Sequence, residues 1–164
     1  MSTPPPSKNS LSAAAKLQQA WRFLSGELRE FELATDQTGP PPYAEFCFFI
    51  AFTLGARDAP CGIGVLINRP SALRVAAHMF GTDQSTLSDD DLEDASAEVC
   101  NVFSDSVARY FRNTDKVSIG LPHRVQAPSY DEICQNSTVF QVFQSGRGSL
   151  VPKVVIFDPL HLSA

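Results

Sequence analysis

Two apolar runs close together in the chain constrain its fold most. Tyr43–Leu54 is rich in Phe and Ile, and Cys61–Asn68 (CGIGVLIN) follows after a short segment that begins at Gly55 and ends at Pro60. Runs of this length and composition are typical of buried β-strands, and a short connection of this kind is typical of a hairpin. We therefore expect an antiparallel pair of strands inside a sheet.

Segments with helical or strand-like patterns surround this pair. The expected helices are Leu11–Ser25, Ser71–Phe80 and a long helix from Ser88 to about Arg112, and the further strands are Glu27–Ala34, Lys116–Leu121, Thr138–Gln144 and Lys153–Phe157. Gly26 and Gly81 stand where the first two helices should end, while Asp36–Pro42 and Ser145–Leu150 are expected loops. This order predicts an α+β fold, an antiparallel β-sheet with helices packed on one face.

Length and composition set limits on the domain organisation and the class of function. A chain of 164 residues, 43% of them hydrophobic, is long enough for one core. We expect residues 1–10, rich in Pro and Ser, to be a flexible N-terminal tail and residues 11–164 to form a single domain. The net charge of −5 argues against nucleic acid as a partner. No apolar run is long enough for a membrane span or a signal peptide, so we expect a cytoplasmic protein with no membrane partner.

The four cysteines do not suggest a metal site or disulfides. Cys47, Cys61, Cys100 and Cys134 form no CxxC pair and have no metal-ligand spacing with histidine. Each lies in an apolar or mixed run, where a buried and unreactive thiol is the usual role.

The long helix has a clear start. Ser88 is a suitable N-cap, and Asp91, three residues later, stands at the capping-box position. Asp89 to Asp91 also place negative charge at the positive end of the helix dipole.

One stripe of this helix is polar. At about 100° per residue, the stripe contains Asp94, Glu98, Asn101, Asp105 and Arg112, and the opposite side contains Leu92, Val99, Phe103, Val107 and Tyr110. Glu98 and Asn101 are three residues apart and should point outward as neighbours. On spacing alone, a solvated outer face is the usual explanation of such a stripe.

The sequence around the stripe resembles a known family. GIGVLINRPSALRVAAHMFG, followed by an acidic cap and DLEDASAEVCNVF, is similar to the CheC/CheX chemotaxis phosphatases, and within them to the CheX type. In that family a long helix bears Asp or Ser, then Glu four residues later, then Asn three residues after that. Asp94, Glu98 and Asn101 match these positions, and Ile119–Pro122 (IGLP) matches the following strand. The resemblance covers about residues 46–124.

The resemblance implies hydrolysis of the aspartyl phosphate on a CheY-like receiver domain. Asn101 would orient a water for in-line attack, and Glu98 would pair with the receiver's lysine. Asp94 and Asp105 are candidate partner-binding residues at the edges of the site, and for Asp94 a role as a cap or in solubility is equally open. The chain would need no metal or other cofactor of its own, since the receiver supplies the Mg²⁺. Relatives pair sheet edges into homodimers, and the sequence leaves a homodimer open.

Two departures from the family pattern leave other functions open. The run after Asn101, Val102–Ser106, lacks the glycine that family members carry there, and Asp105 adds negative charge close to where a phosphate would lie. A CheX-like module that binds a receiver or another signalling partner with weak or no hydrolysis is therefore one alternative. An acidic α+β interaction domain of flagellar-switch type, unrelated to phosphate, is another.

Overall fold

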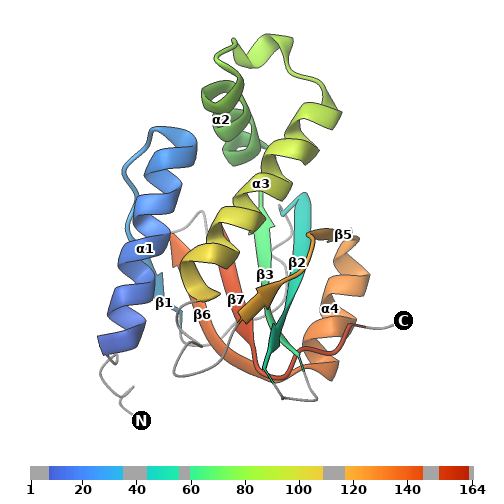
Figure 1. Cartoon of the computed structure of the whole chain (residues 1–164). Coiled ribbons are helices and arrows are strands. Elements are labelled where there is room, and N and C mark those ends of the chain that lie inside the picture. Colours follow the sequence, from blue (N-terminus) through green and yellow to red (C-terminus); the bar gives the residue numbers. More distant parts are fainter. Residues whose placement is uncertain (1–7, 35–43, 56–59, 109–116, 146–151, 163–164) are drawn as a thin grey trace.

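Seven strands form one antiparallel sheet in the computed structural model, which describes residues 8–34, 44–55, 60–108, 117–145 and 152–162 (Figure 1). In chain order the elements are α1 (Lys8–Ser25), β1 (Phe31–Leu33), β2 (Phe46–Leu54), β3 (Cys61–Ile67), α2 (Arg69–Phe80), the 3-10 turn η1 (Gln84–Thr86), α3 (Asp89–Ala108), β4 (Val117–Ile119), β5 (His123–Val125), α4 (Ala127–Asn136), β6 (Val139–Ser145) and β7 (Lys153–Phe157).

The expected central hairpin is confirmed. β2 and β3 pair antiparallel, with Phe46 opposite Ile67 and Phe52 opposite Cys61. The strand order is β1-β6-β7-β3-β2-β4, so β3 lies between β7 and β2 and is buried along its whole length. Burial on both faces explains why its sequence is a continuous apolar run and not an alternating one.

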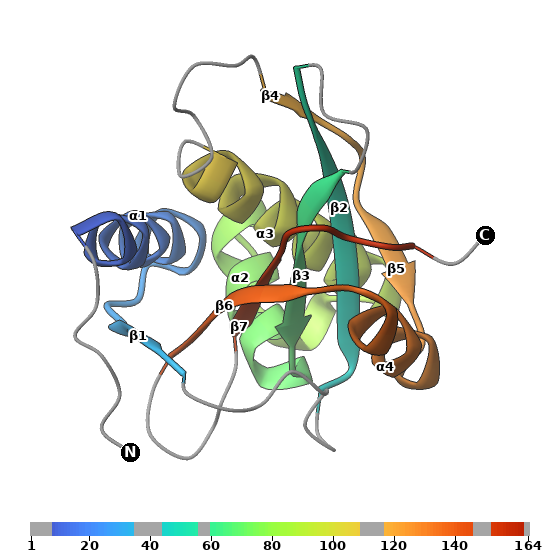
Figure 2. The same cartoon turned by 90° about the horizontal axis from the view of Figure 1, so that it is seen from below.

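The sheet is covered on both faces. Alternate residues of β2, such as Phe48 and Ile50, belong to the core cluster that holds the buried residues of α1, α2 and α3. Phe49 belongs to a second cluster with Tyr130 and Ile133 of α4, on the opposite face (Figure 2). The α+β class and the antiparallel sheet are confirmed, with three helices on one face as expected, and α4 adds a layer that was not expected.

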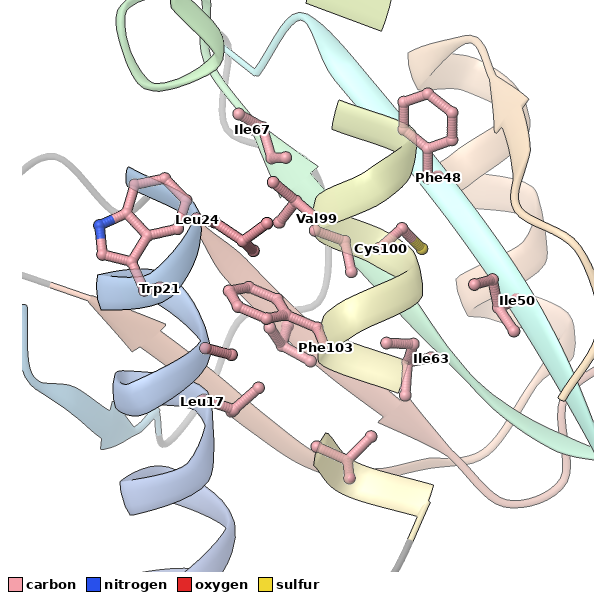
Figure 3. Packing of buried hydrophobic residues seen from close by; sticks show 14 of the residues in the cluster. Leu17, Trp21, Leu24, Phe48, Ile50, Ile63, Ile67, Val99, Cys100 and Phe103 are labelled. Atoms are coloured by element: carbon pink, nitrogen blue, oxygen red, sulfur yellow. The ribbon is translucent and has the colours of Figure 1, made fainter. Parts of the chain in front are cut away.

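α1 and α3 pack on one another above the sheet. Figure 3 shows Leu17, Trp21 and Leu24 of α1 close to Val99 and Phe103 of α3. The Trp21 and Phe103 ring centroids are 6.4 Å apart, and Phe31 of β1 meets Phe103 edge-on at 5.7 Å. This aromatic cluster fixes the distance and rotation of α3 relative to α1.

One edge of the sheet consists of two short strands in line. β4 and β5 both pair with β2, but the register moves by one residue between them, since Phe52 faces Ile119 whereas Phe49 faces His123. The Gly120 N–H donates to the Ala51 carbonyl at 2.9 Å, and a Cβ at position 120 would lie 3.1 Å from that oxygen. Glycine therefore allows the bulge at this point.

Several expected boundaries shift or fall outside the described residues. α1 begins at Lys8, so it includes residues 8–10 of the expected tail. Several expected features lie outside the described ranges: residues 1–7, the loop Asp36–Pro42, all of the loop Ser145–Leu150 except Ser145, and the expected helical residues after Ala108. None of the helices within those ranges combines the length and apolarity that crossing a bilayer requires.

Candidate functional site on helix α3

The start of α3 is held by side chains from three elements. Ser88 N donates to Asp91 Oδ2 at 2.9 Å, and Asp91 N donates to Ser88 Oγ at 3.2 Å, so the expected capping box is confirmed. Arg69 of α2 pairs with Asp89 at 3.0 Å and with Glu45, just before β2, at 2.9 Å. The N-terminal turn of α3 is thus tied to α2 and to the sheet.

Burial of one side of α3 determines which side chains face outward. The buried residues of the helix are Leu92, Ala95, Ser96, Val99, Cys100, Phe103, Ser104, Val107 and Ala108. The expected packing of Leu92, Val99, Phe103 and Val107 is confirmed; Tyr110 and Arg112 lie outside the described residues. The opposite stripe carries Asp94 and Asp105, both exposed, and Glu98 and Asn101, both half-buried.

Glu98 and Asn101 form the centre of this stripe. The Asn101 amide Nδ2 donates to Glu98 Oε2 at 3.5 Å, which is at the long limit of a hydrogen bond and therefore weak. The pair presents a carboxylate and a carboxamide side by side, on a helix whose backbone is held by packing and capping. Such a pair can offer one anionic acceptor together with a group that both donates and accepts.

A basic residue of the sheet edge flanks the stripe on one side. Arg124 of β5 pairs with Glu93 of α3 at 3.4 Å, and its guanidinium lies 4.8 Å from the centroid of the Phe46 ring. Because Glu93 comes just before Asp94, this ion pair lies beside the start of the stripe.

A groove flanks the stripe on the other side, between α1 and α3. Its volume is about 310 Å³, and it is lined by Lys16, Gln19, Ala20, Phe23, Val102, Asp105 and Ser106. Asp105 therefore belongs both to the stripe and to the groove. The groove was not predicted, although one signal was present in the sequence: Phe23 is a large apolar residue that falls outside the buried stripe of Leu17, Trp21 and Leu24.

The four cysteines offer no exposed thiol. None of them forms a disulfide and all are buried, as expected. Burial raises the pKa of the Cys47 and Cys134 thiols to about 11 and raises that of Cys100 as well, so these thiols stay protonated at neutral pH. Among the described residues, no three His, Cys, Asp or Glu side chains are grouped so that they could hold a metal ion.

Comparison of the sequence with known proteins gives no relative. No protein-family model matches the chain, and no curated protein matches it. Solved structures do match. CheX from Desulfovibrio desulfuricans has a TM-score of 0.59 at 14% identity, with 94% of this chain and 100% of that chain covered. CheX in the CheX–CheY–BeF₃–Mg²⁺ complex from Borrelia burgdorferi has a TM-score of 0.60 at 12% identity, with 92% of this chain and 94% of that chain covered.

The same architecture also occurs in a flagellar protein. The middle domain of FliM from Vibrio alginolyticus has a TM-score of 0.60 at 9% identity, with 92% of this chain and 90% of that chain covered. The chain therefore has the fold of CheX and CheC-like chemotaxis proteins, which FliM shares. Because one fold serves different proteins, any function has to be argued from the site.

Proposed function

We propose that this protein hydrolyses the aspartyl phosphate of a CheY-like receiver domain, with Glu98 and Asn101 as the residues that act on the partner. The observation that carries the proposal is a carboxylate and a carboxamide, one turn apart and half-buried, on the outer stripe of α3 in a CheX-like fold. The complex of one CheX with CheY, beryllium fluoride and Mg²⁺ supports a receiver domain as the partner.

In this proposal Asn101 positions the attacking water. Its carboxamide oxygen accepts a hydrogen bond from the water, while its NH₂ donates to a phosphoryl oxygen. The water oxygen bonds to phosphorus as the P–O bond to the receiver's aspartate breaks; the aspartate leaves as a carboxylate, and the water's proton passes to phosphate or solvent. Because the hydrogen bond to Glu98 is long, little free energy is lost when Asn101 turns toward the phosphate.

The positive charges that stabilise the phosphoryl group would come from the partner. The Mg²⁺ would belong to the receiver, and this chain would need no cofactor of its own. The receiver's Mg²⁺ and lysine would stabilise the charge on the transferred phosphoryl group. Glu98 would pair with that lysine and so fix the approach of Asn101. Asp94, one turn before this pair, extends the acidic surface and so favours a basic patch on the partner, and Asp105, one turn after it, would contact the partner at the edge of the site.

A docking module that binds a receiver with weak or no hydrolysis is the second candidate, and Asp105 is the observation that favours it. Its exposed carboxylate lies one turn from Asn101, where repulsion of a phosphate would cost on the order of 1 kcal/mol. In addition, the run Val102–Ser106 directly after Asn101 contains no glycine, and Val102 and Ser106 line the groove beside the helix. A third candidate, a flagellar-switch type of interaction domain, has the support of the FliM likeness.

The phosphoryl lifetime of receiver domains from the same organism tests the proposal. Wild-type protein should shorten this lifetime, Asn101→Ala should not, and Asn136→Ala, which removes an exposed carboxamide at the end of α4, should act as wild type. If wild type leaves every receiver's lifetime unchanged, the phosphatase proposal fails. Retained binding to a receiver loaded with beryllium fluoride would then support the docking module, and absent binding the third candidate.

Localisation and oligomeric state belong to the same proposal. We propose that the protein acts in the cytoplasm, and a homodimer formed by pairing of sheet edges is one oligomeric state that can be tested. The edges available for pairing among the described strands are β1 and the β4/β5 edge, and both consist of three-residue strands. Sedimentation equilibrium at micromolar concentration determines the oligomeric state.

A further inference from the structure

We infer that the groove between α1 and α3 is the second half of the docking surface, and that it takes an apolar side chain of the same receiver domain. Phe23 and Lys16, both on α1, would then be specificity-determining residues. The inference rests on the proposed function for the identity of the partner, and on the groove itself for the position of the contact.

The lining of the groove suits an apolar side chain. Its apolar lining residues are Ala20, which belongs to the main core, Val102, which packs against that core, and Phe23, whose residue surface is 76% exposed. The remaining lining residues, Lys16, Gln19, Asp105 and Ser106, are polar. Apolar residues surrounded by polar ones are the usual composition of a protein interface, and aromatic residues often contribute most of its binding energy.

The groove lies inside the area that a docked receiver must cover. Asp105 lines the groove and is four residues from Asn101, a distance of about 6 Å along the helix axis. An interface at the low end of the standard size range buries roughly 600 Å² on each partner, which is a patch of roughly 14 Å radius. A receiver with its phosphorylated aspartate at Asn101 would therefore extend over Asp105 and the groove.

Charge favours a receiver over a second copy of this chain as the occupant. A second copy would bring the same acidic stripe, with Asp94, Glu98 and Asp105, and it has a net charge of −5. A partner with a basic patch is attracted to this stripe. Lys16, across the groove from Asp105, places positive charge on the α1 side and so lowers the repulsion that Asp105 causes.

Substitution of Phe23 tests the inference with little risk to folding, because an exposed side chain contributes little to the core. The probe is a CheY-like receiver loaded with beryllium fluoride and Mg²⁺, with affinity measured by titration. Phe23→Ala should raise Kd about 10-fold, and in dephosphorylation assays its effect should fall on KM. Leu28→Ala is the matched control, since Leu28 is 70% exposed and is not among the groove's lining residues.

Each outcome separates this inference from the proposed function. If Phe23→Ala binds as tightly as wild type while Asn101→Ala is inactive, the groove inference is wrong and the phosphatase proposal stands. If wild type hydrolyses nothing but Phe23→Ala still weakens receiver binding, the groove inference stands without the phosphatase. If the loaded receiver does not bind, or if Phe23→Ala instead dissociates a homodimer seen by sedimentation, the groove is not a receiver site.

Discussion

The Nδ2 amide of Asn101 lies 3.5 Å from Oε2 of Glu98, one turn apart on the outer stripe of α3. At this distance the two side chains are neighbours without a strong bond between them, so each is free to contact a partner. The roles proposed for them are different: Glu98 contributes to affinity and Asn101 to the rate of the chemical step. Substitutions of the two residues should therefore change different kinetic constants.

Glu98→Gln should weaken docking while keeping the shape of the side chain. Loss of one charge-assisted contact with the receiver's lysine should raise KM about 10-fold. The remaining activity should also depend less on ionic strength, because an attractive charge pair is gone. Initial rates at low and high salt measure both effects. Glu132→Gln, on an exposed position of α4, is the control; equal salt dependence in wild type and Glu98→Gln would contradict the assigned role.

Asp105→Asn should improve activity. Removal of the exposed negative charge one turn from Asn101 removes a repulsion of on the order of 1 kcal/mol, which corresponds to roughly a fivefold increase in kcat/KM. Asp131→Asn is the control, because it changes the net charge by the same amount at an exposed position of α4, away from the site. An increase of the same size in both variants would mean that total charge, and not the position of Asp105, is responsible.

The stability of the fold should depend on pH through Glu27, whose carboxylate contacts both α1 and α2. Glu27 Oε2 accepts hydrogen bonds from Trp21 Nε1 at 3.2 Å and from Arg29 Nε at 2.8 Å, and Arg74 Nε of α2 lies 3.7 Å from the same oxygen. Partial burial alone raises the pKa of this carboxyl, but these hydrogen bonds and charges outweigh it, so that the pKa is lowered from 4.5. Because its pKa is lower in the folded state, the ionised Glu27 carboxylate stabilises the fold at pH values above its unfolded-state pKa. This contribution is lost as the pH falls through the folded-state pKa.

Urea unfolding as a function of pH measures this contribution. At pH 7, Glu27→Gln should lower the free energy of unfolding by about 1 kcal/mol. The difference from wild type should shrink as the pH falls below about 4.5. Glu30→Gln, at an exposed position nearby, should show neither effect. A Glu27→Gln deficit that stays constant down to pH 3 would mean that the carboxylate's charge does not matter.

Local sequence signals predicted the parts of the fold that short-range physics determines. The β2–β3 hairpin followed from two apolar runs, the end of α2 from Gly81, which has φ 64°, and the start of α3 from Ser88 and Asp91. The outward stripe with Glu98 and Asn101 followed from helical periodicity alone. What these residues do for a partner did not follow from periodicity, because a solvated stripe has the same pattern.

Features that depend on tertiary contacts were missed. α4 was missed although its buried residues, Tyr130, Ile133 and Cys134, stand at helical spacing, because the helix has only ten residues and Gln126 at its start makes no side-chain cap. The split of the sheet edge into β4 and β5 depends on the contact of Gly120 with Ala51. The groove needs α1 and α3 side by side, and that arrangement is produced by Trp21 and Phe103, which are far apart in sequence.

Rate and affinity measured together in Asn101→Ala test most directly whether Asn101 positions the attacking water. The variant should bind a receiver loaded with beryllium fluoride and Mg²⁺ within about threefold of wild type, because Glu98 and the rest of the stripe are unchanged. Its kcat for receiver dephosphorylation should fall about 100-fold, as expected when the group that positions a reactant is lost. A variant that keeps the wild-type kcat would contradict the account, and so would one whose loss of activity is explained entirely by loss of binding.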